Sequence, residues 1–141
     1  MTARDAFSLL HTLRVRWAEC DAQGIVFNVN YFLYFDVAMT EWLRALDVHG
    51  DKALEFYTVH AEADYKGSAR FDEVLHIGVR CAKLGRTSMT LEAAIFRDDE
   101  LLTTGKLIYV HAAPKTQEKS PLPEDFIARV MSCEKTVPER G

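Results

Sequence analysis

Hydrophobic and polar positions repeat with two different periods along this chain. In residues 11–17, Leu13, Val15 and Trp17 alternate with two arginines, which is the period of a half-buried strand. Further along, apolar residues recur every three or four positions, at Phe32, Phe35, Met39, Trp42, Leu43 and Leu46. This spacing predicts a helix of roughly 24 Å from Tyr31 to Leu46. Because other apolar residues widen the stripe until the helix is apolar almost all round, we expect it to be enclosed.

The rest of the chain alternates and predicts a sheet. Strands are predicted over residues 58–66, 74–84, 88–96 and 101–111. A short helix is expected from Glu124 to about Ser132, while residues 1–9 and 133–141 show no period and are expected to be a loose lead-in and a flexible tail. This order predicts an α+β fold in which a curved antiparallel five-stranded sheet wraps around one central helix. One helix does not protect the edges of such a sheet, so edge-to-edge pairing with a second copy is expected.

Size, charge and cysteine content narrow the class of protein. The 141 residues, 48% of them hydrophobic, predict one domain over residues 1–141 with its core at about 12–128. A net charge of −4 argues against a nucleic-acid partner. No signal-length apolar stretch begins the chain and no uncharged run of membrane-spanning length occurs, so a cytoplasmic protein without a membrane partner is expected. Cys20, Cys81 and Cys133 are too widely spaced for a disulfide framework or a zinc site, so no metal is expected.

The segment from Asp21 to Asn30 carries the clearest chemistry. Asp21 follows the first predicted strand, Gly24 marks a turn, and Asn28 and Asn30 introduce the long helix. The first N–H groups of a helix have no partner within the helix, and its dipole is positive at that end. A carboxylate facing them could attack a carbonyl whose oxygen the amides hold, or activate water against it. The alternative is that Asp21 only forms the turn and the asparagines only cap the helix.

The same segment resembles a known family. Glu19–Tyr31, followed by Phe35–Leu43, is similar to the opening of hotdog-fold acyl-CoA thioesterases, most closely the 4-hydroxybenzoyl-CoA thioesterase type. The similarity continues in Tyr65–Leu75, Leu84–Ser88 and Pro121–Pro123, and covers roughly residues 12–128. The resemblance implies a hotdog fold, dimers that join two sheets with active sites at their interface, and a homotetramer as a common assembly.

The resemblance also implies roles for individual residues. Asp21 would be catalytic, and the backbone amide near Asn28, within Phe27–Val29, would polarise the thioester carbonyl. Some relatives have tyrosine or histidine at the position of Asn28; asparagine keeps the amide but is no base at neutral pH. Other candidates at the catalytic centre are Gly24, for a positive φ, close packing under the helix end or close approach of the substrate, and Tyr31, for which a place in the core is the favoured alternative. The predicted substrate-binding residues are Phe27, Val29, Arg70, Lys83, Arg86, Thr87 and Ser88, the basic ones for the phosphates of coenzyme A.

The expected function is hydrolysis of an acyl-CoA with an aromatic or a short to medium acyl group, without a cofactor, since coenzyme A is part of the substrate. Asp21 would act as nucleophile or as general base, and the sequence favours neither. Glu41 matches the helix glutamate that another hotdog branch uses, but an ion pair explains it better here. The alternatives are binding or transfer of acyl-CoA or acyl-carrier protein without hydrolysis, and a non-enzymatic oligomeric interaction module. No serine-hydrolase elbow, P-loop or dinucleotide motif is present.

Overall fold

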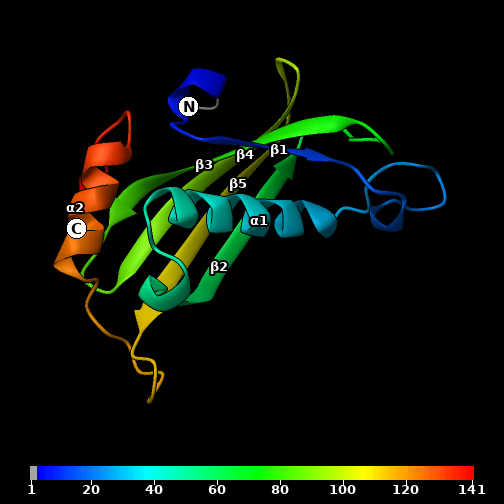
Figure 1. Ribbon diagram of the computed structural model, residues 1–141. Helices are drawn as coiled ribbons and strands as arrows, with labels where there is room; N and C mark the ends of the chain where they lie inside the picture. The colour runs from blue at the N-terminus through cyan, green and yellow to red at the C-terminus, as the bar shows by residue number, and fades with distance from the viewer. Residues whose placement is uncertain (1–2) are drawn as a thin grey trace.

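One long helix, α1 (Asn30–Ala45), lies against one face of an antiparallel sheet (Figure 1). The structure is a computed structural model that describes residues 3–141. The sheet has the order β1-β3-β4-β5-β2. Its strands are β1 (Leu10–Arg14), β2 (Glu55–Tyr65), β3 (Val74–Leu84), β4 (Ser88–Arg97) and β5 (Glu100–Ala112). A second helix, α2 (Glu124–Cys133), packs beside the end of α1, and short 3₁₀ turns lie at Arg4–Ala6, Trp17–Glu19 and Gly50–Lys52.

The predicted elements are all present, most of them with shifted ends. The strand over 74–84 has its predicted bounds, whereas β2 begins at Glu55 instead of Thr58. All pairings among β1 to β5 are antiparallel, as predicted from the short connections. No helix among residues 3–141 is long and apolar enough to cross a membrane.

One face of helix α1 is buried against the sheet, but the predicted enclosure is not seen within a single described chain, because Leu33 is 43% exposed and Asp36 and Thr40 are exposed. Tyr31, Tyr34, Phe35, Ala38 and Trp42 are buried, at the three- and four-residue spacing that the sequence predicted. The helix also comes very close to the sheet: a Cβ placed on Gly105 of β5 would lie 2.5 Å from Cε2 of Phe35. Glycine at this position therefore sets how closely the helix approaches the sheet.

Strand β2 forms one edge of the sheet. Within the described chain it pairs only with β5, and its register shifts between Thr58 and His60, where Val59 is left 59% exposed. Tyr57 and Tyr65 are exposed on the same strand. A long edge strand with exposed apolar side chains presents unpaired N–H and C=O groups to which a strand of another chain can bind.

Both ends of the described chain differ from the prediction. Phe7 is buried against Gly78 on the sheet face opposite α1, together with Ala94 and Phe96. At the other end, Glu139–Arg140 (β6) pairs in parallel with the end of β3. One apolar ring and a two-residue strand are too short to show a period, which is why the sequence pattern carried no signal for either contact.

Candidate active site

Asp21 lies in a tight turn that fixes one of its carboxylate oxygens. Its N–H donates to the carbonyl of Ile25 (2.9 Å), the N–H of Gly24 donates to the carbonyl of Asp21 (3.0 Å), and the N–H of Gln23 donates to Oδ1 (2.8 Å). No hydrogen bond to Oδ2 is present among residues 3–141. Asp21 therefore does form the turn, and one oxygen is still left for chemistry.

Gly24 is required for its backbone conformation. Its φ is +79°, which side chains disfavour, and a Cβ there would meet nothing within 4 Å. Of the reasons that the sequence left open for this glycine, the structure supports the positive φ and gives no support to close packing.

The candidate oxyanion donors lie directly before α1. The N–H of Phe27 already donates to the carbonyl of Glu19 (2.9 Å), so it is removed from the predicted set Phe27–Val29. The N–H groups of Asn30 and Tyr31 close turns onto Phe27 (2.8 Å) and Asn28 (3.3 Å). The N–H groups of Asn28 and Val29 make no hydrogen bond with any residue that the structure describes. Two donors thus remain free at the positive end of the helix dipole.

The asparagine side chains do not cap the helix. Val29 occupies the N-cap position without a side-chain hydrogen bond, and Asn30 is the first helical residue. The Nδ2 of Asn30 instead donates to the carbonyl of Glu19 (2.8 Å). The carbonyl of Asn28 accepts the hydroxyl of Tyr65 (3.1 Å), which joins the end of β2 to this segment.

Glu19 is the central residue that sequence reasoning missed. It is 6% exposed, and its carboxylate accepts hydrogen bonds from the backbone N–H of Arg16 (2.8 Å), the guanidinium of Arg16 (2.6 and 2.8 Å) and the hydroxyl of Tyr34 (2.9 Å). Burial raises the pKa of Glu19, but these hydrogen bonds outweigh it and leave the pKa below its ordinary value. The only signal for Glu19 in the sequence was its place in the segment Glu19–Tyr31 that resembles the thioesterases. A single acid in a short turn does not produce a repeating pattern.

Tyr31 supports the site from the core side. Its buried hydroxyl accepts the N–H of Ala69 (2.9 Å), and the carbonyl of Ala69 accepts the N–H of Val26 (2.8 Å). Burial raises the pKa of Tyr31. These contacts give Tyr31 a structural role next to the turn, which is the alternative that the sequence left open.

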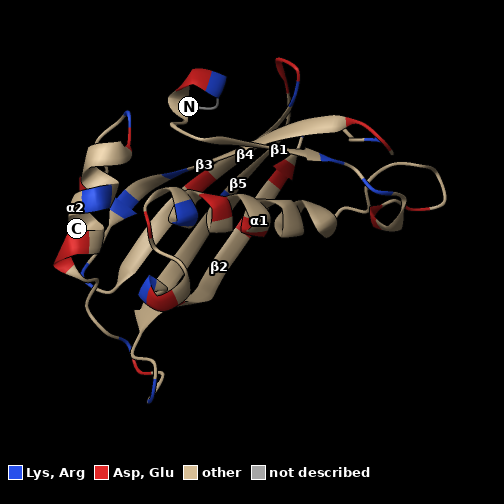
Figure 2. Ribbon diagram, in the orientation of Figure 1, with Lys and Arg blue, Asp and Glu red and all other residues tan. Residues whose placement is uncertain are grey.

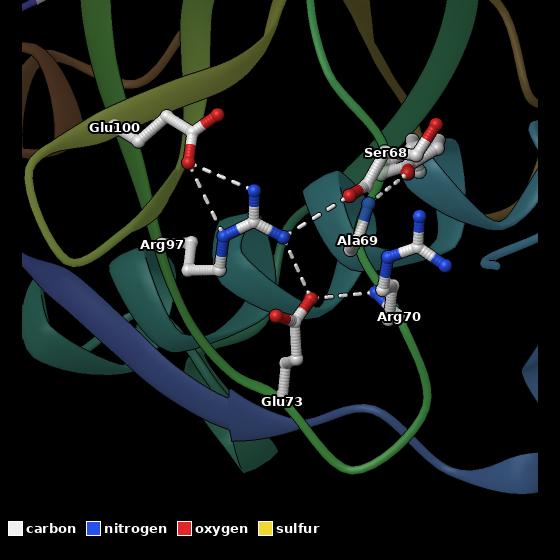
Figure 3. A network of polar contacts seen from close by, with 7 residues as sticks. Ser68, Ala69, Arg70, Glu73, Arg97 and Glu100 are labelled. Atoms are coloured by element: carbon white, nitrogen blue, oxygen red, sulfur yellow. Dashed lines mark hydrogen bonds and ion pairs between the residues drawn. The ribbon is translucent and has the colours of Figure 1, made fainter.

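An ion-pair network holds the loop that carries Ala69 (Figure 3). The guanidinium of Arg97 donates to the carbonyl of Ser68 (3.1 Å), to Glu73 (2.8 Å) and to Glu100 (2.8 Å). Glu73 also accepts the N–H of Arg70 (2.7 Å). No sequence pattern singled out Arg97, but in the structure it holds the loop whose Ala69 N–H donates to Tyr31 at the start of α1.

The first turns of α1 carry no charged side chain of their own. Asp, Glu, Lys and Arg are absent from Asn30 to Phe35, and the first of them in the helix is Asp36; the start of α1 is accordingly tan in Figure 2. Glu41, further along, pairs with Arg44 (3.5 Å), as its interpretation as an ion-pair residue predicted. No carboxylate of α1 therefore neutralises the positive end of the helix dipole at its first turns.

Comparison with known proteins assigns the family. A family model described as "Thioesterase superfamily" matches residues 23–104, more than half of the chain. The chain belongs to the thioesterase superfamily. The acyl-CoA thioester hydrolase YbgC of Escherichia coli O6:H1 is 24% identical over 121 residues, which cover 82% of this chain and 90% of YbgC.

Solved structures share the fold of this thioesterase. A thioesterase from Thermus thermophilus, in complex with coenzyme A and zinc, superposes with a TM-score of 0.83 at 24% identity, covering 94% of this chain and 98% of its own. The gentisyl-coenzyme A thioesterase BH1999 gives a TM-score of 0.76 at 27% identity, covering 82% and 97%. The predicted α+β hotdog fold is confirmed.

The predicted substrate-binding residues of the thioesterase fall into two groups. The first group lies near the Asp21 turn: Phe27 and Val29 are exposed before α1, and Arg70, also exposed, forms a β-bridge with Ile25. Four others, Lys83, Arg86, Thr87 and Ser88, surround the β3–β4 turn. There the carbonyl of Arg86 accepts the N–H of Leu122 (2.9 Å), just before α2. Since α2 packs on Trp42 near the C-terminal end of α1, this second group lies at the opposite end of α1 from Asp21 within one protomer (Figure 1).

Proposed function

We propose that this thioesterase hydrolyses an acyl-CoA to the free acid and coenzyme A, with Asp21 as the reacting carboxylate. One observation carries the proposal: an oriented carboxylate lies in the turn that leads to two free N–H groups at the start of helix α1. The name of the E. coli relative, an acyl-CoA thioester hydrolase, and the coenzyme A complex of the Thermus protein support this substrate class. The resemblance of Glu19–Tyr31 supports the 4-hydroxybenzoyl-CoA type within the superfamily.

The geometry suits acyl transfer from sulfur. The N–H groups of Asn28 and Val29 would bind the thioester oxygen and stabilise the negative charge that it gains when the carbonyl is attacked. In one route Oδ2 of Asp21 attacks the carbonyl carbon, the C–S bond breaks, coenzyme A leaves as the thiolate, and water cleaves the resulting anhydride to restore Asp21. In the other route, Asp21 takes a proton from water while that water attacks the same carbon. Thiolate is a good leaving group, so neither route requires a strong acid.

A second copy of the chain would complete the site. We infer that two copies pair antiparallel along β2, which has an exposed apolar edge. The Tyr65 end of β2 contacts Asn28, whereas its Glu55 end pairs with Ala112, beside the hydrogen bond from His111 to Thr87. Antiparallel pairing reverses one copy and would bring Arg86, Thr87 and Ser88 of the second copy towards the first copy's Asp21. Association of two such dimers would give the homotetramer.

The acyl group would lie among apolar side chains at the helix start. Phe27 and Val29 are 51% and 54% exposed there, and both follow the turn of Asp21 directly. We propose an aromatic or a short to medium acyl chain. The aromatic option is supported by the gentisyl-coenzyme A thioesterase, whose name gives an aromatic acyl group at 27% identity to this chain.

The test is Asp21→Asn, assayed on a panel of aliphatic and aromatic acyl-CoAs. The amide keeps the shape of the side chain but is neither nucleophile nor base, so we expect kcat to fall by about 10²–10⁴-fold with an unchanged melting temperature. Asp36→Asn, an exposed acid on α1, serves as the matched control and should retain activity. Undiminished hydrolysis by Asp21→Asn would refute the assignment. Binding of acyl-CoA by a wild type that turns none over would favour the non-hydrolytic alternative.

A further inference from the structure

Glu19 joins three segments of the chain through both its backbone and its side chain. Its carbonyl oxygen accepts the N–H of Phe27 (2.9 Å) and the Nδ2 of Asn30 (2.8 Å). Its carboxylate accepts the hydroxyl of Tyr34 (2.9 Å), one helical turn after Asn30, in addition to the three donors of Arg16. The short turn before Asp21 is therefore tied to the segment before α1 and to one face of α1.

The two ends of this connection flank the proposed reacting groups. Glu19 stands two residues before Asp21, and Asn30 directly follows Val29. The hydrogen bond between Asn30 and Glu19 therefore limits how far the Asp21 carboxylate can move relative to the N–H groups of Asn28 and Val29. We propose that Glu19, Asn30 and Tyr34 form a positioning clamp that sets the distance between the carboxylate and the oxyanion donors. This role rests on the proposed function and deepens it.

Within the clamp, the side chain of Asn30 contributes more to positioning than to folding. This side chain is only partly buried and caps nothing, so its loss leaves the apolar face of α1 intact. Catalysis, in contrast, is sensitive to small displacements, because a misplacement of about 1 Å can cost about 100-fold in rate. Since the oxyanion donors act most strongly in the transition state, the effect should fall on kcat and much less on KM.

The experiment compares Asn30→Ala and Asn30→Asp with the wild type. The alanine removes the donor, and the aspartate keeps its size but turns an oxygen towards the Glu19 carbonyl. We expect kcat to fall by about 10- to 100-fold in both, with KM changed less than about threefold and the melting temperature lowered by only a few degrees. Thr40→Ala is the matched control, because it removes a side-chain hydrogen bond to a backbone carbonyl of the same helix (3.0 Å to Asp36) and should leave kcat unchanged.

Two outcomes separate the clamp from the proposed function. If Asp21→Asn loses activity while Asn30→Ala and Asn30→Asp keep the wild-type kcat, the clamp is refuted and the proposed function stands. If the wild type hydrolyses no acyl-CoA, the proposed function fails. Hydrogen exchange of the Phe27 amide then tests whether Asn30 holds the turn of Glu19 to the start of α1. Exchange should be faster in Asn30→Ala than in wild type and Thr40→Ala, and equal exchange in all three would overturn the clamp.

Discussion

Replacing Gly105 by alanine tests the close approach of α1 to the sheet, on which the position of the helix start depends. The new Cβ would lie 2.5 Å from Cε2, 2.8 Å from Cζ and 3.2 Å from Cδ2 of Phe35. Phe35 is completely buried in the middle of α1, so its ring has no solvent to turn into. Either the ring or the helix must move, and both are held by a closely packed core.

The expected loss follows from two opposing effects. Overpacking of this kind costs about 1–3 kcal/mol, whereas alanine in place of glycine in a strand recovers about 0.5–1 kcal/mol of backbone entropy. The difference spans about 0–2.5 kcal/mol, and the middle of the two ranges gives a net loss of about 1 kcal/mol. With an unfolding entropy of about 2.1 cal/mol/K per residue, or about 0.3 kcal/mol/K for this chain, the melting temperature should fall by about 4 °C.

Thermal unfolding at one fixed protein concentration measures this shift, because self-association would otherwise change the melting temperature. Phe35→Leu provides the second background, since it removes the ring atoms with which the new methyl group clashes. In that background Gly105→Ala should be neutral or stabilising, and the difference between the two backgrounds gives the coupling energy. An equal loss in both backgrounds, or no loss in the wild type, would refute the packing argument.

Two other predictions concern the far end of the fold and the sheet edge. Oε2 of buried Glu134 accepts Trp42 Nε1 (3.1 Å) and the N–H of Cys81 (2.7 Å), while Oε1 has no partner among residues 3–141, and burial raises the pKa of Glu134. Because the pKa of Glu134 is raised in the folded state, its protonated form stabilises the fold at low pH, and this contribution is lost as pH rises through the folded-state pKa. In urea unfolding, the stability of the wild type relative to Glu134→Gln should therefore increase as pH falls from 7 towards the ordinary pKa of glutamate, and an unchanged difference would contradict this. Val59→Lys should prevent pairing along β2, giving monomers by light scattering and at least about a tenfold loss of hydrolysis, whereas exposed Val137→Lys should change neither. A Val59→Lys protein that remains dimeric would contradict the proposed interface.

The parts of the fold that could be predicted are those with a repeated local pattern. The spacing of Phe35, Met39 and Trp42 predicted α1, and alternation along residues 74–84 predicted β3 with its observed bounds. Phe7 and the Glu139–Arg140 pair could not be predicted in this way. Phe7 packs on Gly78, and Glu139–Arg140 pairs with the end of β3, both far away in the sequence. Neither contact produces a repeating pattern in the residues around it.

The same distinction explains the candidate site. Asp21, Gly24 and the start of α1 were predictable because they are consecutive in the chain, and their geometry is set by a turn and a helix end. The contacts of Glu19 and Arg97 were not. Glu19 is buried where the hydroxyl of Tyr34 reaches it from α1, and Arg97 acts through the carbonyl of Ser68, which the fold brings to it.

The number of free donors in the site follows from how the helix begins. A capping side chain at position 29 would have bonded the N–H of Tyr31 or Phe32, and would not have reached those of Asn28 and Val29. The N–H of Phe27 bonds back to Glu19, and the N–H groups of Asn30, Tyr31 and Phe32 close turns onto the three residues from Phe27 to Val29. Only Asn28 and Val29 are left over in this part of the described chain. Asn30 can serve the proposed clamp because it has no capping role to fill, so the irregular helix start would supply both the donors and the side chain that positions them.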